Sequence, residues 1–369
     1  MKRTLTNILV TGGAGFIGAN FIHFLFNKTD FQGRIINLDA LTYAGNLESL
    51  KDIDLKFGIN TLGKTKAKYI FEYADITDKD AVNRIFKEYS IDTVVHFAAE
   101  SHVDRSILGP EAFIKTNIIG TFNLLETARN FWKTSDSSIR QDVLFHHVST
   151  DEVYGSLGET GYFEETTPYD PRSPYSSSKA SSDHLVCSYS HTYELPITLS
   201  NCSNNYGPFQ FPEKLIPLMI LNILGGKPLP IYGDGKNVRD WLYVEDHNNA
   251  VWTIMNKGKI GEKYNIGGEN EWQNIKLLEK LIDFVAKEIN KDSAEIKKTI
   301  KWVQDRPGHD RRYAINCNKL KNELGWSQKY TFEEGLLATV KWYLSNPNWV
   351  ANVQSGEYAN WIKNNYENR

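Results

Sequence analysis

A glycine-rich turn near the start of the chain constrains the fold more than any other feature. Gly12, Gly15 and Gly18 follow a short apolar run at 7–11 and open a helical pattern at 15–27. Glycines at this spacing allow a tight turn, close approach of the backbone to a pyrophosphate, and tight packing of helix on strand. The helix N-terminus then attracts the phosphates. The turn therefore predicts the first unit of a dinucleotide-binding fold.

The alternation of strands and helices continues through the first half of the chain. Strands are expected at 7–11, 34–39, 70–73, 93–98, 143–149 and 197–201, and helices at 15–27, 78–89, 117–131 and 176–193. Such alternation is typical of βαβ units. We therefore expect an α/β protein with a Rossmann-type, doubly wound parallel sheet, and ligands at the carboxyl ends of its strands.

The pattern changes after about residue 205, where prolines and glycine pairs become frequent. Here we expect a smaller, loop-rich substrate-binding lobe with strands at 240–244 and 262–266 and helices at 274–291 and 332–344. The expected division is a dinucleotide-binding domain over 1–205, to which the chain can return, and a partly interleaved lobe over 206–369. The polar, Lys-rich segment 51–68 is expected to be a solvated surface loop.

Composition narrows the class of protein. The chain of 369 residues carries a formal net charge of -3 and is 41% hydrophobic, which is typical of an ordinary globular protein and disfavours nucleic-acid binding. Cys187, Cys202 and Cys317 are spread singly, so neither a disulfide framework nor a metal site is expected. The longest apolar run, 215–224, is about half a membrane span. We therefore expect a cytoplasmic protein that does not bind membranes.

Acidic residues at the strand ends predict which dinucleotide is bound. Asp39 closes the second expected strand, about 20 residues after Gly18, where a carboxylate can accept hydrogen bonds from the adenosine ribose and repel a 2′-phosphate. NAD is therefore favoured over NADP, and the alternative is an Asp that only caps the strand end. Asp75 and Ile76 follow the third strand, and we expect them to contact the adenine ring. The alternative is that Asp75 belongs to a turn that starts the next helix, near Asp78.

Tyr175 and Lys179 form a candidate catalytic pair. They lie four residues apart at the start of the helix expected at 176–193, so both project from one face. A phenol with a pKa of about 10 is a poor base at neutral pH, and a nearby ammonium stabilises the phenolate. The pair can then remove a proton from a sugar hydroxyl while hydride leaves the same carbon. The alternative is a surface Tyr–Lys pair.

Thr150, Asp151 and Glu152 directly follow the fifth expected strand. Thr150 can hydrogen-bond the same hydroxyl as Tyr175. Two adjacent carboxyls tend to split their pKa values, so one can act as a base on a carbon-bound proton while the other protonates a departing hydroxyl. The alternative is an acidic pair that caps a turn. Together with Tyr175, these residues predict a site that moves a hydride and eliminates water.

These motifs resemble the extended short-chain dehydrogenases/reductases and, more narrowly, the dTDP-glucose 4,6-dehydratase family. The Asp-Glu pair after Thr150 separates these dehydratases from the epimerases. The resemblance runs from Leu9 to about Trp342. The shared stretches are TGGAGFIG from Thr11, HFAAESHVDRS from His96, STDEVYG from Ser149, YSSSK from Tyr175, SNNYGPFQFPEKLIP from Ser203, PIYGDGKNVRDWLYVEDH from Pro230 and DRPGHDRRYAI from Asp305.

The resemblance implies an NAD-dependent lyase that acts on a nucleoside-diphosphate hexose, with dTDP-glucose as the expected substrate. In the implied reaction, Tyr175 deprotonates the 4-hydroxyl as the 4-position is oxidised. Glu152 then removes the 5-proton, Asp151 protonates the departing 6-hydroxyl, and hydride returns to the 6-position. The resemblance also implies a homodimer through the helices at 117–131 and 176–193.

The turn and the resemblance together assign the binding residues. Arg239 is expected to clamp the diphosphate and Tyr232 to stack on the base; the alternatives are a surface salt bridge at Arg239 and a charged turn at 305–309. The cofactor residues are Gly12, Gly15, Phe16, Ile17, Gly18, Asp39, Ala40, Leu41, Thr42, Asp75, Ile76, Phe97, Ala98, Ala99, Ser101, Thr116, Tyr175, Lys179 and Asn205. The substrate residues are Ser101, Thr150, Asn204, Lys214, Leu215, Pro230, Ile231, Tyr232, Arg239, Asn274, Asp305, Arg306, Pro307, Gly308 and His309.

Three other functions stay open on the sequence. A sugar-nucleotide 4-epimerase would share the cofactor motif and the Tyr–Lys pair without needing Asp151 and Glu152. A 4,6-dehydratase could use another nucleotide, such as UDP or GDP. A regulator that senses NAD without turnover could dispense with Tyr175 and Lys179.

Overall fold

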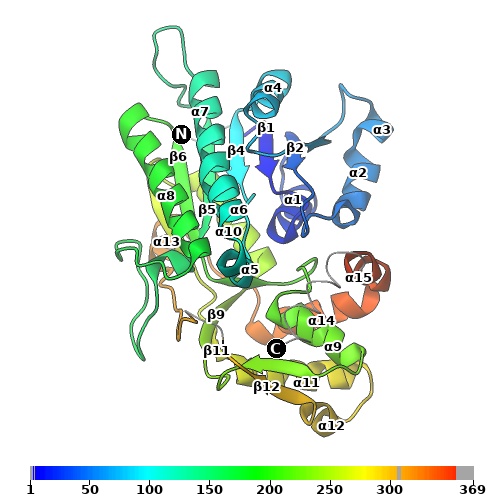
Figure 1. Ribbon diagram of the computed structural model, residues 1–369. Helices are drawn as coiled ribbons and strands as arrows, with labels where there is room; N and C mark the ends of the chain where they lie inside the picture. The colour runs from blue at the N-terminus through cyan, green and yellow to red at the C-terminus, as the bar shows by residue number, and fades with distance from the viewer. Residues whose placement is uncertain (1–2, 4, 306–308, 355–369) are drawn as a thin grey trace.

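The computed structural model describes residues 3, 5–305 and 309–354. The predicted substrate residues Arg306, Pro307 and Gly308 lie outside these ranges. A large sheet flanked by helices occupies the upper part of the molecule in Figure 1, and two small sheets with their own helices occupy the lower part. Within the described ranges, no helix combines the length and apolar character needed to cross a membrane.

Seven strands of the described chain form the large sheet, and every pairing between them is parallel. The order matches the Rossmann arrangement, in which the strand order reverses beside β1. In spatial order the strands are β3 (Tyr69–Tyr73), β2 (Arg34–Asp39), β1 (Asn7–Thr11), β4 (Thr93–His96), β5 (Leu144–Thr150), β6 (Ile197–Cys202) and β10 (Lys263–Ile266).

Helices cover both faces of this sheet, because successive side chains of a strand point to opposite faces and both sets are apolar. In β1, Ile8 and Val10 belong to the apolar core on one face, whereas Leu9 belongs to the core on the other. The first face is covered by α1 (Phe16–Lys28), α10 (Val244–Lys257) and α13 (Asn318–Leu324). The second is covered by α4 (Lys79–Tyr89), α7 (Thr121–Phe131) and α8 (Pro174–Tyr193).

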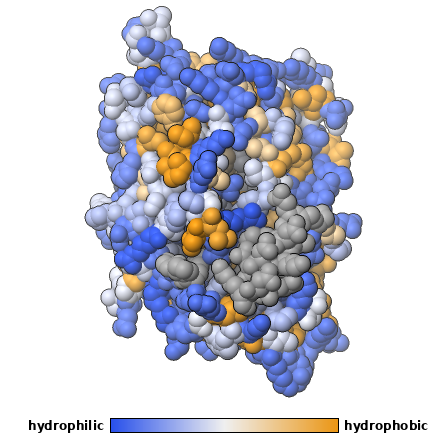
Figure 2. All heavy atoms as spheres, in the orientation of Figure 1, coloured by the Kyte–Doolittle hydropathy of each residue, from blue (hydrophilic) through white to orange (hydrophobic). Residues whose placement is uncertain are grey.

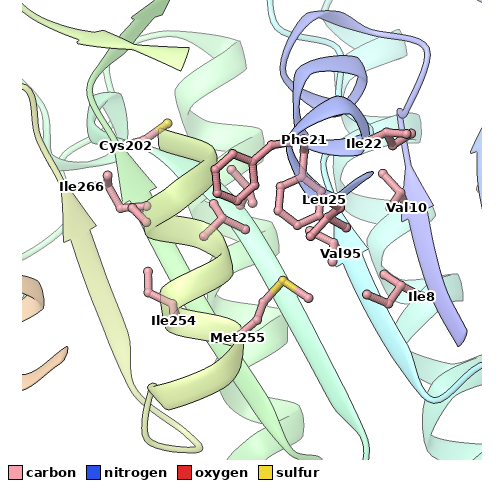
Figure 3. Packing of buried hydrophobic residues seen from close by; sticks show 14 of the residues in the cluster. Ile8, Val10, Phe21, Ile22, Leu25, Val95, Cys202, Ile254, Met255 and Ile266 are labelled. Atoms are coloured by element: carbon pink, nitrogen blue, oxygen red, sulfur yellow. The ribbon is translucent and has the colours of Figure 1, made fainter. Parts of the chain in front are cut away.

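The first face is packed mainly by α1 and α10. Figure 3 shows Phe21 and Leu25 of α1 on the same side of α10 as Met255, whereas Ile254 lies on the other side of α10. All four of these side chains are buried. This contact fixes the helix that follows the glycine turn against a helix that the chain forms more than 200 residues later.

The chain therefore enters the large sheet twice. After β6 it leaves for the smaller part, and β10 then pairs with the outer side of β6 in parallel register. The strand expected at 262–266 is present, but it extends the large sheet rather than the smaller lobe. The boundaries of the two expected domains remain a prediction.

The smaller part is built around two short sheets and an apolar core of its own. Its strands are β7 (Asn204–Tyr206), β9 (Val238–Tyr243) and β11 (Glu271–Gln273) in one sheet, and β8 (Leu229–Tyr232) and β12 (Ile300–Val303) in the other. Its helices are α9 (Leu215–Leu224), α11 (Asn274–Glu288), α12 (Ser293–Lys297), α14 (Phe332–Ser345) and α15 (Pro347–Gln354).

The expectation of a solvated loop at 51–68 is wrong. This segment forms α2 (Lys51–Phe57) and α3 (Ile59–Leu62), preceded by a short 3-10 helix, η1 (Leu47–Leu50). Ile53 is buried in the core beneath α1, and the Phe57 ring stacks on Phe26 with a centroid separation of 4.4 Å. These two apolar side chains, four residues apart, attach the helix, while its lysines stay on the outer side.

The remaining helices lie before α7 and α8. They are α5 (Val103–Leu108), α6 (Pro110–Phe113), the π-helix η2 (Ile114–Gly120) and the 3-10 helix η3 (Asp151–Tyr154). The single helix expected at 117–131 is thus a π-helix that continues into α7. Wide turns of this kind are frequent at functional sites.

Candidate active site

One pocket of about 310 Å³ lies at the carboxyl ends of β1, β2, β4, β5 and β6. It brings together all five predicted catalytic residues and most of the predicted cofactor residues. The predicted residues that line it are Gly12, Gly15, Phe16, Ile17, Gly18, Asp39, Ala40, Thr42, Asp75, Ile76, Phe97, Ala98, Ala99, Ser101, Thr116, Thr150, Asp151, Glu152, Tyr175, Lys179, Asn204, Asn205 and Lys214.

The glycine turn leaves room for a phosphate and no room for side chains. Gly12 has a φ of 69°, and a Cβ there would lie 2.7 Å from the backbone of Ala98. A Cβ on Gly18 would lie 2.3 Å from the Gly12 carbonyl oxygen. Gly15 caps α1 without a side-chain hydrogen bond. The first N–H groups of α1 therefore face the pocket without a capping side chain, as an anion site requires.

Asp39 is held at the end of β2 by two backbone amides. Its Oδ2 accepts a hydrogen bond from Ala14 N at 2.9 Å, and its Oδ1 accepts one from Leu41 N at 2.8 Å. Burial raises the pKa of Asp39, and these two hydrogen bonds oppose the rise. The predicted cofactor residue Leu41 does not line the pocket. It instead orients the Asp39 carboxylate through its own N–H.

Asp75 and Ile76 both line the pocket, and Asp75 also makes a turn. Its Oδ1 accepts hydrogen bonds from the backbone and the hydroxyl of Thr77, both at 2.8 Å. The cap of α4 is a different residue, Asp78, whose side chain accepts from two backbone amides. The helix-starting role considered for Asp75 therefore belongs to Asp78.

Asp151 is a buried acid whose surroundings favour its protonated form. Burial raises its pKa well above the usual range, and the neighbouring carboxyls of Glu152 and Asp240 raise it further, whereas Arg239 opposes them. Its Oδ1 accepts a hydrogen bond from the Thr150 hydroxyl at 3.3 Å. Its Oδ2 is buried and has no hydrogen-bond partner among the described residues. A neutral carboxyl at this position can donate a proton to a ligand.

The Thr150 hydroxyl also starts η3, because it accepts a hydrogen bond from Glu152 N at 3.3 Å. Thr150 therefore caps this turn, and the capping role considered for the acidic pair is wrong. Both carboxyls line the pocket. The capping turn thus aims the pair at the pocket rather than at solvent.

Tyr175 and Lys179 reach the pocket from the first two turns of α8. A capping box between Ser173 and Ser176, with Pro174 at the first helical position, fixes where this helix begins. Burial raises the pKa of Tyr175, as do the nearby Glu152 carboxyl and other neighbours, while the Thr150 hydroxyl lowers it. The phenol therefore holds its proton strongly, and its action as a base requires positive charge beside it.

Lys179 supplies one such charge. Its side chain is buried, and Nζ donates a hydrogen bond to Val148 O at 2.9 Å. Burial lowers the pKa of Lys179, and the charge of Asp183 opposes this. The pair is not at the protein surface, so the alternative of a surface Tyr–Lys pair does not describe it.

Thr116 enters the pocket from the π-helix, and the next residue locks this helix to the rest of the site. Asn117 accepts a hydrogen bond from Glu100 N at 2.9 Å and donates to Glu100 O at 3.0 Å and to Ser178 Oγ at 2.8 Å. The side chain thus ties η2 to the loop after β4 and to α8.

Arg239 lies behind Asp151 rather than on the surface. Its Nη1 donates to Val238 O at 2.7 Å and its Nη2 to Asp310 O at 2.9 Å, and its guanidinium lies 4.2 Å from the ring centroid of Tyr313. The side chain is 5% exposed. The surface salt bridge considered for Arg239 is therefore wrong.

The other described residues predicted to bind the substrate do not line the pocket. Tyr232 donates to Asp104 Oδ2 at 3.2 Å, and its ring meets His309 edge-on. His309 is paired with Asp305 at 2.6 Å. The predicted residues outside the pocket lining are Leu215, Pro230, Ile231, Tyr232, Arg239, Asn274, Asp305 and His309.

The pocket is also lined by residues that were not predicted, and Glu213 and Cys202 are two of them. Glu213 is buried, accepts a hydrogen bond from Tyr43 at 3.0 Å, and lies 3.4 Å from Arg105 Nε. It precedes the predicted Lys214 in the quoted motif, which was the signal available for it. Cys202 ends β6 at the carboxyl edge of the sheet, and the rule that ligands lie at this edge could have identified it.

Buried acceptors in the pocket indicate what it can hold. The Oδ1 atoms of Asn204 and Asn205 are buried without a hydrogen-bond partner among the described residues. Ligand hydroxyl or amide groups would satisfy them. No cluster of three or more His, Cys, Asp or Glu side chains able to hold a metal ion occurs in the described part of the chain.

Residues 9–339 match the protein family described as GDP-mannose 4,6 dehydratase. The chain is also 54% identical over 371 residues to dTDP-glucose 4,6-dehydratase 1 of Escherichia coli strain K12, an alignment that covers 98% of this chain and 99% of the relative. A probable dTDP-glucose 4,6-dehydratase of Sinorhizobium fredii is 52% identical and is covered over 97% of its length.

Solved structures show the same similarity. A dTDP-glucose 4,6-dehydratase from Bacillus anthracis in complex with NAD has a TM-score of 0.80 and 47% identity, with 94% of this chain and 99% of that chain covered. A dTDP-glucose 4,6-dehydratase from Streptomyces venezuelae with NAD and dTDP bound has a TM-score of 0.83 and 39% identity, with 94% and 100% covered. A UDP-glucose 4-epimerase from Thermotoga maritima has a TM-score of 0.78 at 29% identity, with 93% and 100% covered.

Replacing Asp39 tests the dinucleotide end of the pocket. The variant Asp39→Asn loses the negative charge but keeps the shape of the side chain. We expect NAD to bind about 10- to 100-fold more weakly, because a hydrogen bond to a charged group contributes about 1.5–3 kcal/mol. NADP, freed from repulsion, should lose less affinity. Titration calorimetry with both dinucleotides measures this. Glu88→Gln, an exposed change on α4, is the control, and equal NAD affinity in Asp39→Asn and wild type would disprove the assignment.

Proposed function

The chain belongs to the dTDP-glucose 4,6-dehydratase family, and we propose that it converts dTDP-glucose to dTDP-4-keto-6-deoxyglucose and water. One observation carries the proposal. The buried carboxyl of Asp151, whose pKa is raised by burial, and the carboxyl of Glu152 share a pocket with Tyr175 and Lys179. A simple alcohol oxidation has no use for the first two groups, whereas removal of water requires an acid and a base.

The dinucleotide side of the pocket fits NAD. The glycine turn admits a pyrophosphate that any Cβ on Gly12 or Gly18 would obstruct, and the Asp39 carboxylate suits a ribose without a 2′-phosphate. NAD, when bound, supplies the hydride acceptor, a hydride for the later return, and a positive charge beside the phenol.

The first task of the protein is to remove the proton of the sugar 4-hydroxyl. Tyr175 takes this proton, helped by the Lys179 ammonium, while the Thr150 hydroxyl orients the reacting oxygen. Burial of Tyr175 excludes water from the phenol, so the charge of Lys179 acts at low dielectric. The product of this step is a sugar with a 4-ketone.

The second task is to remove water. The 4-ketone acidifies the neighbouring 5-proton, and Glu152 accepts that proton. The proton held on Asp151 passes to the departing 6-hydroxyl, which leaves as water. The two carboxyls differ in the way this needs, because Asp151 is buried and lies between other acids, whereas Glu152 is half-buried. A proton then returns to the 5-position as hydride returns to the 6-position.

The smaller part of the protein binds the nucleotide. Lys214 and Asn204 contribute from the pocket itself, and Arg239 is preorganised behind it for the diphosphate by its hydrogen bonds and by Tyr313. Tyr232, whose ring contacts His309 edge-on, is the residue we expect to stack on the base. We infer the preference for dTDP over other nucleotides from the similarity to dTDP-glucose 4,6-dehydratases.

Product mass tests the function directly. Incubated with dTDP-glucose, the protein should yield a product lighter by one water, with no net consumption of NAD. UDP-glucose and GDP-mannose in parallel reactions should react far more slowly. Mass spectrometry distinguishes the alternatives, because a 4-epimerase returns a product of unchanged mass and an NAD sensor returns only substrate.

The variant Glu152→Gln should stop the reaction halfway. It removes the base for the 5-proton but leaves Tyr175 and Lys179 in place, so oxidation proceeds and elimination does not. We expect NADH absorbance to appear and persist while product formation falls about 10²- to 10⁴-fold, the usual range for loss of a positioned base. Rapid-mixing absorbance with product analysis measures both. Glu159→Gln, in an exposed loop, should behave as wild type, and normal product formation by Glu152→Gln would exclude this base.

We also propose that the protein is a homodimer. Exposed apolar side chains gather on adjacent helices on one face of the molecule, and Figure 2 shows apolar patches among polar side chains over α5 and α7. A second copy of this chain would bury them. The side chains are Ile107 (40% exposed), Leu108 (75%), Ile114 (45%), Ile119 (46%), Phe122 (42%) and Tyr193 (40%). Cytoplasmic location remains a prediction, supported by the three free cysteines.

A charge placed in this apolar face should separate the subunits. Phe122→Glu puts a carboxylate on α7 in the middle of the face, where burial in an interface would be strongly unfavourable. We expect wild type to sediment as a dimer and Phe122→Glu as a monomer. Leu55→Glu, at an exposed position on α2, should stay dimeric. A dimeric Phe122→Glu would place the interface elsewhere.

A further inference from the structure

A buried acid lies one helical turn beyond Lys179, outside the pocket described above. Asp183 follows Lys179 by four residues on α8, so both side chains leave the same face of the helix. Asp183 is 1% exposed and Lys179 is 4% exposed. Burying a single charge is strongly unfavourable, whereas two opposite charges buried near each other compensate.

Four side chains hold the Asp183 carboxylate. Its Oδ2 accepts hydrogen bonds from Ser149 Oγ at 2.9 Å, Tyr169 Oη at 2.8 Å and Asn201 Nδ2 at 3.2 Å, and its Oδ1 lies 3.2 Å from His147 Nε2. These donors come from β5, β6 and the segment before α8. Burial alone would raise the pKa of Asp183, but the donors and nearby cationic groups lower it below its usual value. The carboxylate therefore stays ionised.

The positive charge that balances Asp183 is not on the histidine. Burial lowers the pKa of His147 to about 4, so this imidazole is neutral at physiological pH and donates as an uncharged ring. Lys179 is the fully buried cation near the carboxylate. Lys263 is only partly buried, and its ammonium lies over the ring of Tyr169 at 4.7 Å.

Lys179 depends on this charge to remain protonated. Burial lowers its pKa, Asp183 is the largest influence that raises it, and Cys202 adds a smaller one. The His96 and His147 rings are neutral, because burial lowers the pKa of each. The titratable groups around Lys179 thus come from its own helix and from three strands: Tyr175 and Asp183 on α8, His96 on β4, His147 on β5 and Cys202 on β6.

We propose that Asp183 is a positioning residue for proton transfer at Tyr175, because its fixed charge keeps the Lys179 ammonium protonated and seated against Val148 O. The same carboxylate fixes Ser149, the residue before Thr150, and so aligns the end of β5 with α8. This inference rests on the proposed function, since it assigns a supporting role to the same Tyr–Lys pair. Asp183 does not line the pocket.

The variant Asp183→Asn keeps the shape of the side chain and removes its charge. Without that charge the pKa of Lys179 falls further, so the ammonium is lost at a lower pH. The basic limb of the kcat profile for dTDP-glucose should therefore move to lower pH by about one unit or more. The KM for dTDP-glucose should stay within about twofold of wild type, because Asp183 lies outside the pocket. An unmoved basic limb would overturn the proposal.

Tyr169→Phe is the matched control. It removes one hydrogen bond to the same Oδ2 atom but leaves the charge of Asp183 in place. If the network acts only by holding the structure together, both variants should lose stability and leave the shape of the pH profile unchanged. If the charge matters, only Asp183→Asn moves the basic limb. A shift of equal size in Tyr169→Phe would assign the effect to packing and would contradict the inference.

A stability measurement that needs no substrate separates this inference from the proposed function. In the Lys179→Met background there is no ammonium to balance, so Asp183→Asn should lower the melting temperature by less than it does in wild type. An equal loss in both backgrounds, or failure of Asp183→Asn to fold in both, would show that Asp183 acts independently of Lys179. If no sugar nucleotide loses water but this coupling is present, the proposed function fails and the charge pairing stands.

Discussion

The parallel pairing of β5 with β4 and β6 is the constraint on which the site depends. Parallel strands end at one edge of the sheet, so Thr150 at the end of β5 lies beside Cys202 at the end of β6 and near Phe97, which follows β4. The glycine turn after β1 and Asp39 at the end of β2 reach the same edge. Side chains from distant parts of the chain therefore meet in one pocket because of strand direction, and the local turns only refine where each one points.

That dependence explains how much of the molecule could be predicted. Strands such as β1 and β2 are buried on both faces, so their apolar runs are unbroken and their limits are visible in the sequence. Thr150, Asp151 and Glu152 lie at or directly after the end of β5 and line the pocket, whereas Tyr175 and Lys179 reach it from α8. The prediction of a loop at 51–68 was wrong because Ile53 and Phe57 are two apolar residues among many polar ones. Their spacing of four residues places both on one side of α2, and they pack this helix against the core. Leu41 was assigned to the cofactor because a backbone amide has no signature in a sequence.

Contacts made across long sequence separations could not be predicted. Arg239 is oriented by Asp310 and Tyr313, some 70 residues later, and Asp183 is held by donors on two strands and a loop. A single Asp in a Ser-rich helix looks like a surface residue in the sequence, and only its packing against the sheet shows that it is buried. The role of Asp183 depends on the residues around it, and these become known only when the fold is known.

The site needs one buried group that is neutral, Asp151, and another that is charged, Lys179. Asp151 has to be neutral, and burial, together with the acids around it, raises its pKa in that direction. Lys179 has to be charged in an equally dry place, where an anion one helical turn away supports it. Neither group favours folding as much as an apolar residue of the same size would, so the site is a region where stability is given up for function.

The second entry of the chain into the large sheet has a consequence for how the protein is made. Until residues 263–266 leave the ribosome, β6 has an unpaired edge, and the face covered by α10 is without its helix. The nascent chain must therefore keep an open strand and an apolar surface from associating with other chains while about 60 residues of the smaller part are synthesised. At typical rates of about 5–20 residues per second, that exposure lasts about 3–12 seconds. An unpaired strand edge and an apolar surface of this kind favour aggregation, and the pairing of β10 with β6 removes the open edge.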